Sequence, residues 1–190
     1  MQAIRLKTEH LFDPMGVDFT APRLYWNCNG GKKQTAYQIV AADDGGSILW
    51  DSGRVESAAM CVKWGGAPVL PKTKVFWQVR LWDEENAAGD WSKASFETGI
   101  GVWSAKWITG DYKVNKKERY PVDCFRKAFR TADVKKARLY ITACGLYEAR
   151  LNGQRVGDFV RAPGITDYRK RLQYQTYDVT PLLRNGENTL

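Results

Sequence analysis

Residues 74–83, with the sequence KVFWQVRLWD, alternate along the chain with a period of two. One face of this stretch is wholly apolar and consists of Val75, Trp77, Val79 and Leu81. The opposite face mixes polar and aromatic side chains: Phe76, Gln78, Arg80 and Trp82. A period of two is typical of a β-strand with one face in a core. The pattern predicts a strand whose second face lies near solvent or a neighbouring module.

Shorter strands are also predicted in the first half. They are residues 23–28, 34–42, 48–51, 54–62 and 94–98, and turn signals such as Asp43-Asp-Gly-Gly46 and Ser52-Gly53 separate them. In the second segment Tyr37, Ile39 and Ala41 share one face. Many short strands with turns every 8–12 residues, over about 100 residues, are typical of an immunoglobulin-like sandwich. We expect residues 1–102 to form such a sandwich of fibronectin type III character.

A second β-module is expected over residues 103–190, after a loop that extends to Pro121. Strands are predicted at residues 124–129, 137–144, 147–151, 154–156 and 172–179. Asn152-Gly153 predicts a two-residue hairpin, because a type I′ turn needs positive φ at both central positions. After a short helical turn at Pro181, residues 188–190 look like the opening of a strand. We therefore expect an all-β chain of two consecutive sandwiches, the second jelly-roll-like and incomplete at its C-terminal end.

Composition limits the cellular setting. The chain has no apolar run near the roughly 20 residues that span a bilayer, and its opening lacks the apolar segment of a signal peptide. We expect a cytoplasmic protein with no membrane partner, or a secreted or periplasmic one if a leader has been removed.

Cys28, Cys61, Cys124 and Cys144 form no close pair. We expect buried free thiols rather than disulfides or a zinc site.

A net charge of +8 raises nucleic acid as a partner. Nucleic-acid binding modules concentrate charge in a patch and add a recognisable reading element. Here the basic residues cluster loosely at residues 113–119, 126–138 and 161–171, among strand-like apolar residues. We interpret them as solvated strand faces and expect no nucleic-acid partner.

Candidate catalytic groups are few. A glycosidase needs two carboxylates that face each other across a cleft, but Asp43-Asp44 and Asp83-Glu84-Glu85 are adjacent residues in turns. The single histidine, His10, has no evident partner in the sequence.

Trp26, Trp77 and Tyr140 are expected in the core. For Trp82, Trp91, Trp103 and Trp107, contact between the modules and sugar stacking both remain open. We predict no catalytic residue, no metal site and no cofactor, and leave calcium binding open.

The segment Thr166-Asp-Tyr-Arg-Lys-Arg171 is the candidate ligand surface. Asp167 and Arg171 can hydrogen-bond ring hydroxyls, while Tyr168 can offer an apolar face to a sugar. The alternative is a charged loop that docks on another domain, since loops carry both functions.

Ordered sequence blocks carry a family resemblance across nearly the whole chain. In the first half they include residues 21–26 (APRLYW), 34–39 (QTAYQI), 76–83 (FWQVRLWD) and 96–99 (FETG). In the second half they include residues 151–158 (LNGQRVGD), 162–168 (APGITDY) and 174–180 (YQTYDVT). In this order they resemble the fibronectin-like module and the adjoining N-terminal domain of bacterial α-L-rhamnosidases. The family pattern has Trp where this chain has Ile165.

The resemblance implies an inverting glycoside hydrolase that removes terminal α-L-rhamnose from rhamnose-containing glycosides. It also implies that the acid and base belong to a helical (α/α)₆ barrel far downstream, so no catalytic residue carries over. We expect these modules to support that barrel through intramolecular contact and to orient substrate. The alternative is a free-standing carbohydrate-binding or adhesive protein.

Overall fold

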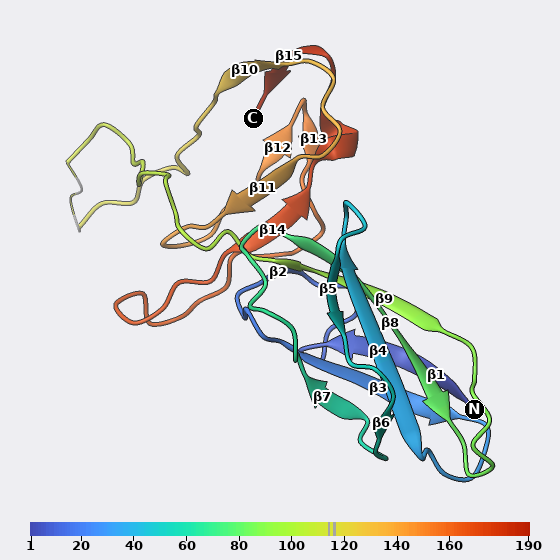
Figure 1. The fold of residues 1–190 in the computed structure, drawn as a ribbon. Helices are drawn as coiled ribbons and strands as arrows, with labels where there is room; N and C mark the ends of the chain where they lie inside the picture. The colour runs from blue at the N-terminus through green and yellow to red at the C-terminus, as the bar shows by residue number, and fades with distance from the viewer. Residues whose placement is uncertain (114, 116) are drawn as a thin grey trace. The chain divides into compact units, whose positions relative to one another are not determined.

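The computed structural model describes residues 1–113, 115 and 117–190, and Val114 and Lys116 of the predicted loop lie outside the described residues. The chain divides into two compact units, Met1–Gly101 and Val102–Leu190. Strands make up the regular structure of both, apart from one 3₁₀ turn, η1 (Thr180–Leu182). The all-β class is therefore confirmed (Figure 1).

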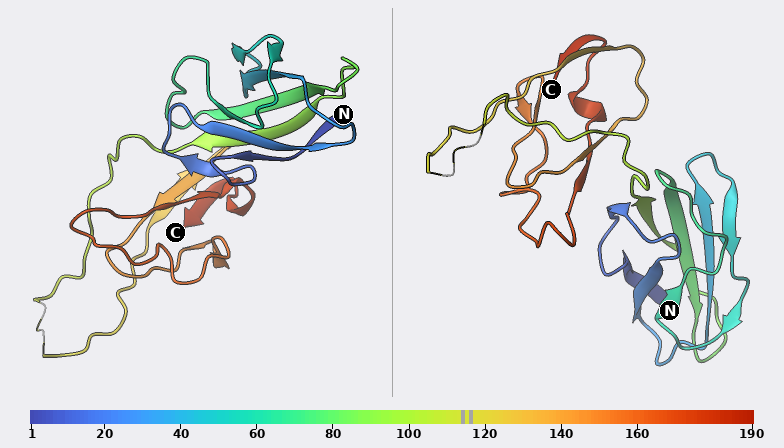
Figure 2. Two further views of the ribbon diagram at one scale, coloured as in Figure 1. Left: turned by 90° about the horizontal axis from the view of Figure 1, so that it is seen from below. Right: turned by 90° about the vertical axis from the view of Figure 1, so that its left-hand side faces the viewer.

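The first unit is a sandwich of two sheets (Figure 2). The larger sheet has the order β2-β9-β8-β4-β5, and β6 also pairs with β4. Its strands are β2 (Met15–Val17), β9 (Ser92–Thr98), β8 (Lys74–Trp82), β4 (Ala36–Asp43), β5 (Ile48–Asp51) and β6 (Val55–Glu56). The smaller sheet has the order β1-β3-β7, with β1 (Gln2–Thr8), β3 (Arg23–Asn29) and β7 (Cys61–Lys63).

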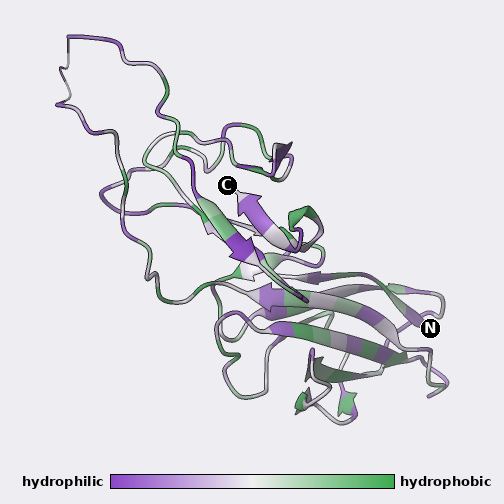
Figure 3. Cartoon of the chain, turned by 90° about the horizontal axis from the view of Figure 1, so that it is seen from above, coloured by the Kyte–Doolittle hydropathy of each residue, from purple (hydrophilic) through white to green (hydrophobic). Residues whose placement is uncertain are grey.

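The core of the first unit lies between these sheets. The predicted inner face of β8 is confirmed, because Val75, Trp77, Val79 and Leu81 are all at most 1% exposed. They pack with buried residues of other strands, including Leu24, Trp26, Ile39 and Phe96. The alternation of hydrophobic and hydrophilic residues is visible along these strands in Figure 3.

Trp82 departs from the expected solvent-facing position. It is only 7% exposed, although it lies on the outer face of β8. The guanidinium groups of Arg54 and Arg80 each lie 4.8 Å from its ring centroid. Arg80 lies equally close to the ring of Trp91. Cation–π stacking from two neighbouring chain segments thus covers an aromatic ring that no second sheet covers.

The single strand expected at residues 54–62 was wrong. The chain instead forms β6, which pairs with β4 of the larger sheet, and then β7, which pairs with β3 of the smaller sheet. Ser57 and Ala59 lie between these two strands, and Gln34 donates hydrogen bonds to their carbonyls. The chain therefore crosses from one sheet to the other at this point.

The expectation of buried cysteines was also wrong for three of the four. All four are free thiols, but Cys61, Cys124 and Cys144 are exposed and Cys28 is half-buried. Their apolar sequence neighbours do not determine their burial, because Cys61 starts a short edge strand and Cys124 and Cys144 lie outside strands.

The second unit consists of three two-stranded antiparallel ladders. They pair β10 (Ala128–Thr131) with β15 (Gly186–Thr189), β11 (Arg138–Ile141) with β14 (Gln175–Asp178), and β12 (Arg150–Leu151) with β13 (Gln154–Arg155). The predicted hairpin between β12 and β13 is confirmed, because φ is 54° at Asn152 and 83° at Gly153. The small core contains Ala149, Leu151, Val156 and Val179.

Asn188 is the polar centre of this unit and is fully buried. Its Nδ2 donates to Thr131 Oγ1 at 2.9 Å and to the carbonyls of Arg184 and Gly186. Its Oδ1 accepts from Asn152 Nδ2 at 2.8 Å. Because Asn152 also bonds the backbone of Thr189, the two amides join the hairpin to β15.

Candidate functional site

The predicted ligand segment is a closed turn in the loop that leads into β14 (Figure 1). The backbone N–H groups of Lys170 and Arg171 donate to the Asp167 carbonyl at 2.8 and 3.0 Å. The hydroxyl of Thr166 donates to the Arg171 carbonyl. These bonds join both ends of the segment, so its exposed side chains project from a defined backbone.

The structure pairs Asp167 with Arg169, a residue that the sequence analysis did not single out. Arg169 Nε lies 3.1 Å from Asp167 Oδ1, and the backbone N–H of Arg169 bonds the same oxygen. These bonds hold the pKa of Asp167 below its ordinary value. Tyr168 and Arg171 are both exposed. Asp167 and Arg171 share a backbone bond, but no bond joins their side chains.

Three of the five remaining carboxylates suggested by the sequence are shown as hydrogen-bond acceptors in turns. Asp43 Oδ1 accepts the N–H groups of Gly45 and Ser47, and Asp83 Oδ1 accepts those of Glu85 and Ala87. Glu84 accepts the N–H groups of Lys32 and Lys33 on a neighbouring loop. These bonds give the carboxylates a structural role in turns, as expected for Asp and Glu there.

His10 does have a partner, contrary to the sequence-based expectation. Its Nε2 lies 3.1 Å from the Tyr25 hydroxyl, and the two rings are 4.3 Å apart. The neighbouring Glu9 forms an ion pair with Arg23 at 2.8 Å. The tight turn at residues 9 and 10, both with positive φ, thereby packs against β3.

The aromatic residues divide into buried and exposed groups. Trp26 and Trp77 are at most 2% exposed, as predicted for core residues, whereas Tyr140 is half-buried beside Tyr174. Trp103 packs edge-on against Tyr174 and is 38% exposed, and Trp107 is 64% exposed. The exposed rings leave sugar stacking and contact with another domain open.

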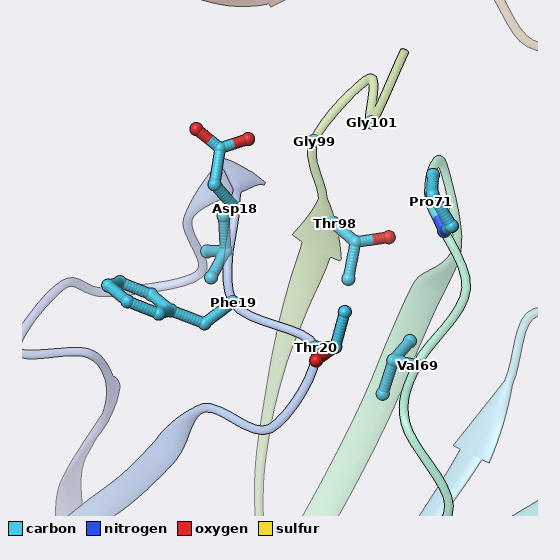
Figure 4. Close-up of a pocket in the computed structure, with 9 residues that line it drawn as sticks. Asp18, Phe19, Thr20, Val69, Pro71, Thr98, Gly99 and Gly101 are labelled. Carbon is cyan, nitrogen blue, oxygen red and sulfur yellow. The ribbon is translucent and has the colours of Figure 1, made fainter. Parts of the chain in front are cut away.

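A small pocket lies at the end of the first unit where β9 ends (Figure 4). Thr20, Val69, Pro71 and Thr98 face one another around it, and the Asp18 carboxylate points away from them. Its volume of about 70 Å³ is well below the several hundred Å³ typical of small-molecule sites. The pocket is therefore too small to enclose a sugar ring.

Among the described residues, no group of three His, Cys, Asp or Glu side chains is arranged to hold a metal ion. The same residues include no helix that is long and apolar enough to cross a membrane.

Two family models match consecutive parts of the chain. Residues 3–101 match the Rha78A-like N-terminal immunoglobulin domain, and residues 132–190 match the α-L-rhamnosidase N-terminal domain. The matched segments fall within the first and second compact units respectively.

Individual relatives agree with these models. An α-L-rhamnosidase from Formosa agariphila is 36% identical over 96% of this chain, which spans 22% of that relative. The solved structure of an α-L-rhamnosidase from Dictyoglumus thermophilum is 36% identical, with a TM-score of 0.88 over 100% of this chain and 24% of its own. The enzyme from Aspergillus terreus is 34% identical, with a TM-score of 0.86 over 99% of this chain and 23% of its own.

Proposed function

Since this chain belongs to the α-L-rhamnosidase family and matches its N-terminal domains, we propose that it forms the non-catalytic front end of a glycoside hydrolase that releases terminal α-L-rhamnose. The chain spans less than a quarter of the relatives it matches. The proposed activity therefore belongs to a whole enzyme, in which these units support the catalytic domain.

One observation carries this proposal. The chain matches the Dictyoglumus enzyme over its full length, with a TM-score of 0.88 at 36% identity. Fold alone does not imply function, but a match of sequence and fold through two successive domains goes beyond a shared sandwich architecture. The absence of a catalytic role for this chain has further support. Asp43, Asp83 and Glu84 each accept backbone hydrogen bonds in loops, which gives these carboxylates a structural role.

We propose that the second unit makes the contacts with the catalytic domain. It exposes large apolar side chains far in excess of its small core, including Val102, Trp107, Val122, Phe159 and Ile165. Where exposed apolar side chains adjoin one another, they form the surface of an interaction site. A domain within the same enzyme is the partner that the family relationship favours.

A domain exchange tests the proposal. The N-terminal region of the Dictyoglumus enzyme would be replaced by this chain, and hydrolysis of an aryl α-L-rhamnoside would be measured for the chimera, for the same enzyme without the region, and for the 190-residue chain. We expect a folded, active chimera, an impaired deletion variant and an inactive isolated chain.

Turnover by the isolated chain that disappears when one of its own carboxylates is mutated would contradict the assignment. A chimera no better than the deletion variant would instead favour a free-standing carbohydrate-binding or adhesive protein.

A further inference from the structure

The charge of the chain is divided unequally between its two units. Residues 1–101 contain 11 Lys and Arg against 12 Asp and Glu, whereas residues 102–190 contain 18 against 9. The net charge of +8 thus arises entirely in the second unit. A surface with one sign of charge attracts partners of the opposite sign and raises their local concentration.

The basic cluster at residues 161–171 lies outside the strands, as do the described residues of the cluster at 113–119, contrary to our interpretation of them as strand faces. The second cluster ends in the closed turn of residues 166–171, which presents Arg169, Lys170 and Arg171 in succession. All three side chains are exposed. Because the backbone bonds of the turn hold it closed, these cations are presented together.

Asp167 offsets only part of this charge. Its carboxylate bonds Arg169, and within the part of the chain that the structure describes neither Lys170 nor Arg171 forms an ion pair. Three hydrogen bonds from Arg169 thus occupy most of the roughly four acceptor positions of this carboxylate. The available groups of the turn are therefore two cations beside an exposed tyrosine, Tyr168.

We propose that the turn of residues 166–171 binds an anionic glycan, one whose sugars carry carboxylate or sulfate groups. The guanidinium of Arg171 offers a planar fork that matches either anion with two hydrogen bonds, and Lys170 adds a compact positive charge. Tyr168 offers an apolar face for the adjoining sugar ring. That the anion is a glycan rests on the proposed function. The turn then selects rhamnosides whose remaining sugars are acidic.

Binding of the 190-residue chain to four defined polymers tests this proposal. The polymers are polygalacturonate (carboxylate), dextran sulfate (sulfate), neutral dextran and a single-stranded oligodeoxynucleotide. We expect binding to at least one of the two anionic glycans, no binding to neutral dextran, and weaker binding as salt screens the charges. The two glycan arms identify which anion is preferred.

Matched variants distinguish binding at the turn of residues 166–171 from a general effect of the net charge of the chain. Lys170→Ser with Arg171→Ser keeps the backbone bonds and should weaken glycan binding about tenfold, as expected for the loss of two exposed ion pairs. Lys32→Ser with Lys33→Ser removes the same charge from an exposed loop of the first unit and should change affinity less than about twofold. Asp167→Asn should tighten binding because it releases Arg169, whereas recognition of neutral hydroxyls by Asp167 would make it weaker.

Three outcomes would overturn the proposal: equal losses in both double variants, binding of the oligonucleotide as tight as that of the glycans, or no binding to either glycan. None of these measurements depends on hydrolysis, so a negative result leaves the proposed function standing.

Discussion

The indole nitrogen of Trp26 donates a 3.0 Å hydrogen bond to Oε1 of Gln34, and both side chains are buried. The Nε2 of the same amide donates to the carbonyls of Ser57 and Ala59, at 2.9 and 3.0 Å. One glutamine thereby satisfies a core tryptophan and holds the segment in which the chain crosses between the two sheets.

Replacing Gln34 with Leu should destabilise the first unit. The substitution fills similar space but leaves the Trp26 indole and two carbonyls without their partner. Each buried polar group left unpaired costs about 1–3 kcal/mol, and urea unfolding would measure the total. In a Trp26→Phe background the cost should be smaller, because the indole donor is then already absent. Equal costs in both backgrounds would show that the 3.0 Å bond is not energetically coupled.

The two tryptophans of β8 should differ in their contribution to stability. Trp77→Ala removes a fully buried ring and its 3.2 Å bond to Thr8, and should cost about 3–5 kcal/mol. Trp82→Ala should cost less, because Arg54 and Arg80 can hydrate once the ring between them is gone. Chemical denaturation of both variants checks the order, and a larger loss at Trp82 would refute it.

Asn188→Asp should destabilise the second unit selectively. The new oxygen cannot donate to Thr131, Arg184 and Gly186, so these three acceptors lose their partner. We expect a loss of at least about 2 kcal/mol, seen as faster hydrogen exchange within residues 128–190. Asn27→Asp makes the same change at an exposed position of β3 and should alter stability by less than about 0.5 kcal/mol. Similar losses in both variants would argue against a central role for Asn188.

The Glu9–Arg23 ion pair predicts a dependence on pH. Hydrogen bonds from Arg23 lower the pKa of Glu9 below its ordinary value of 4.5, so the folded state binds the proton more weakly than the unfolded state. The contribution to stability is present above that ordinary value and is lost as the pH falls through the lower folded pKa. Unfolding measured between neutral pH and pH about 3 should show this loss. Glu9→Gln and Arg23→Met should both reduce the acid-dependent fall, whereas Glu85→Gln, on an exposed turn, should preserve it.

The sequence predicted strands best where alternation was uninterrupted. β8 keeps a strict period of two and was identified with its inner face. β1 was not predicted, because Arg5 has a positive φ of 53° and the register with β3 shifts between Ile4 and Lys7. The buried residues of β1 are therefore Ala3, Leu6 and Thr8, a spacing of three and then two. A bulge breaks the only signal that a short strand offers.

The sequence did not predict the side-chain pairing within the candidate segment. Residue types identified the segment 166–171 as charged and aromatic, but they did not show that Asp167 would bond Arg169 two residues away. That pairing depends on the backbone turn, which several weak hydrogen bonds determine together. The placement of Trp82 between Arg54 and Arg80 is similar, since the two cations come from different strands and loops.

The ladder of the second unit that pairs β10 with β15 joins residues far apart in the chain: Ala128 pairs with Thr189 and Thr131 with Gly186. During translation, about sixty further residues are therefore synthesised after β10 before its partner strand is complete. Its unpaired edge is exposed throughout that interval. The sheets of the first unit are complete by Thr98, so we expect the first unit to fold before the second during translation.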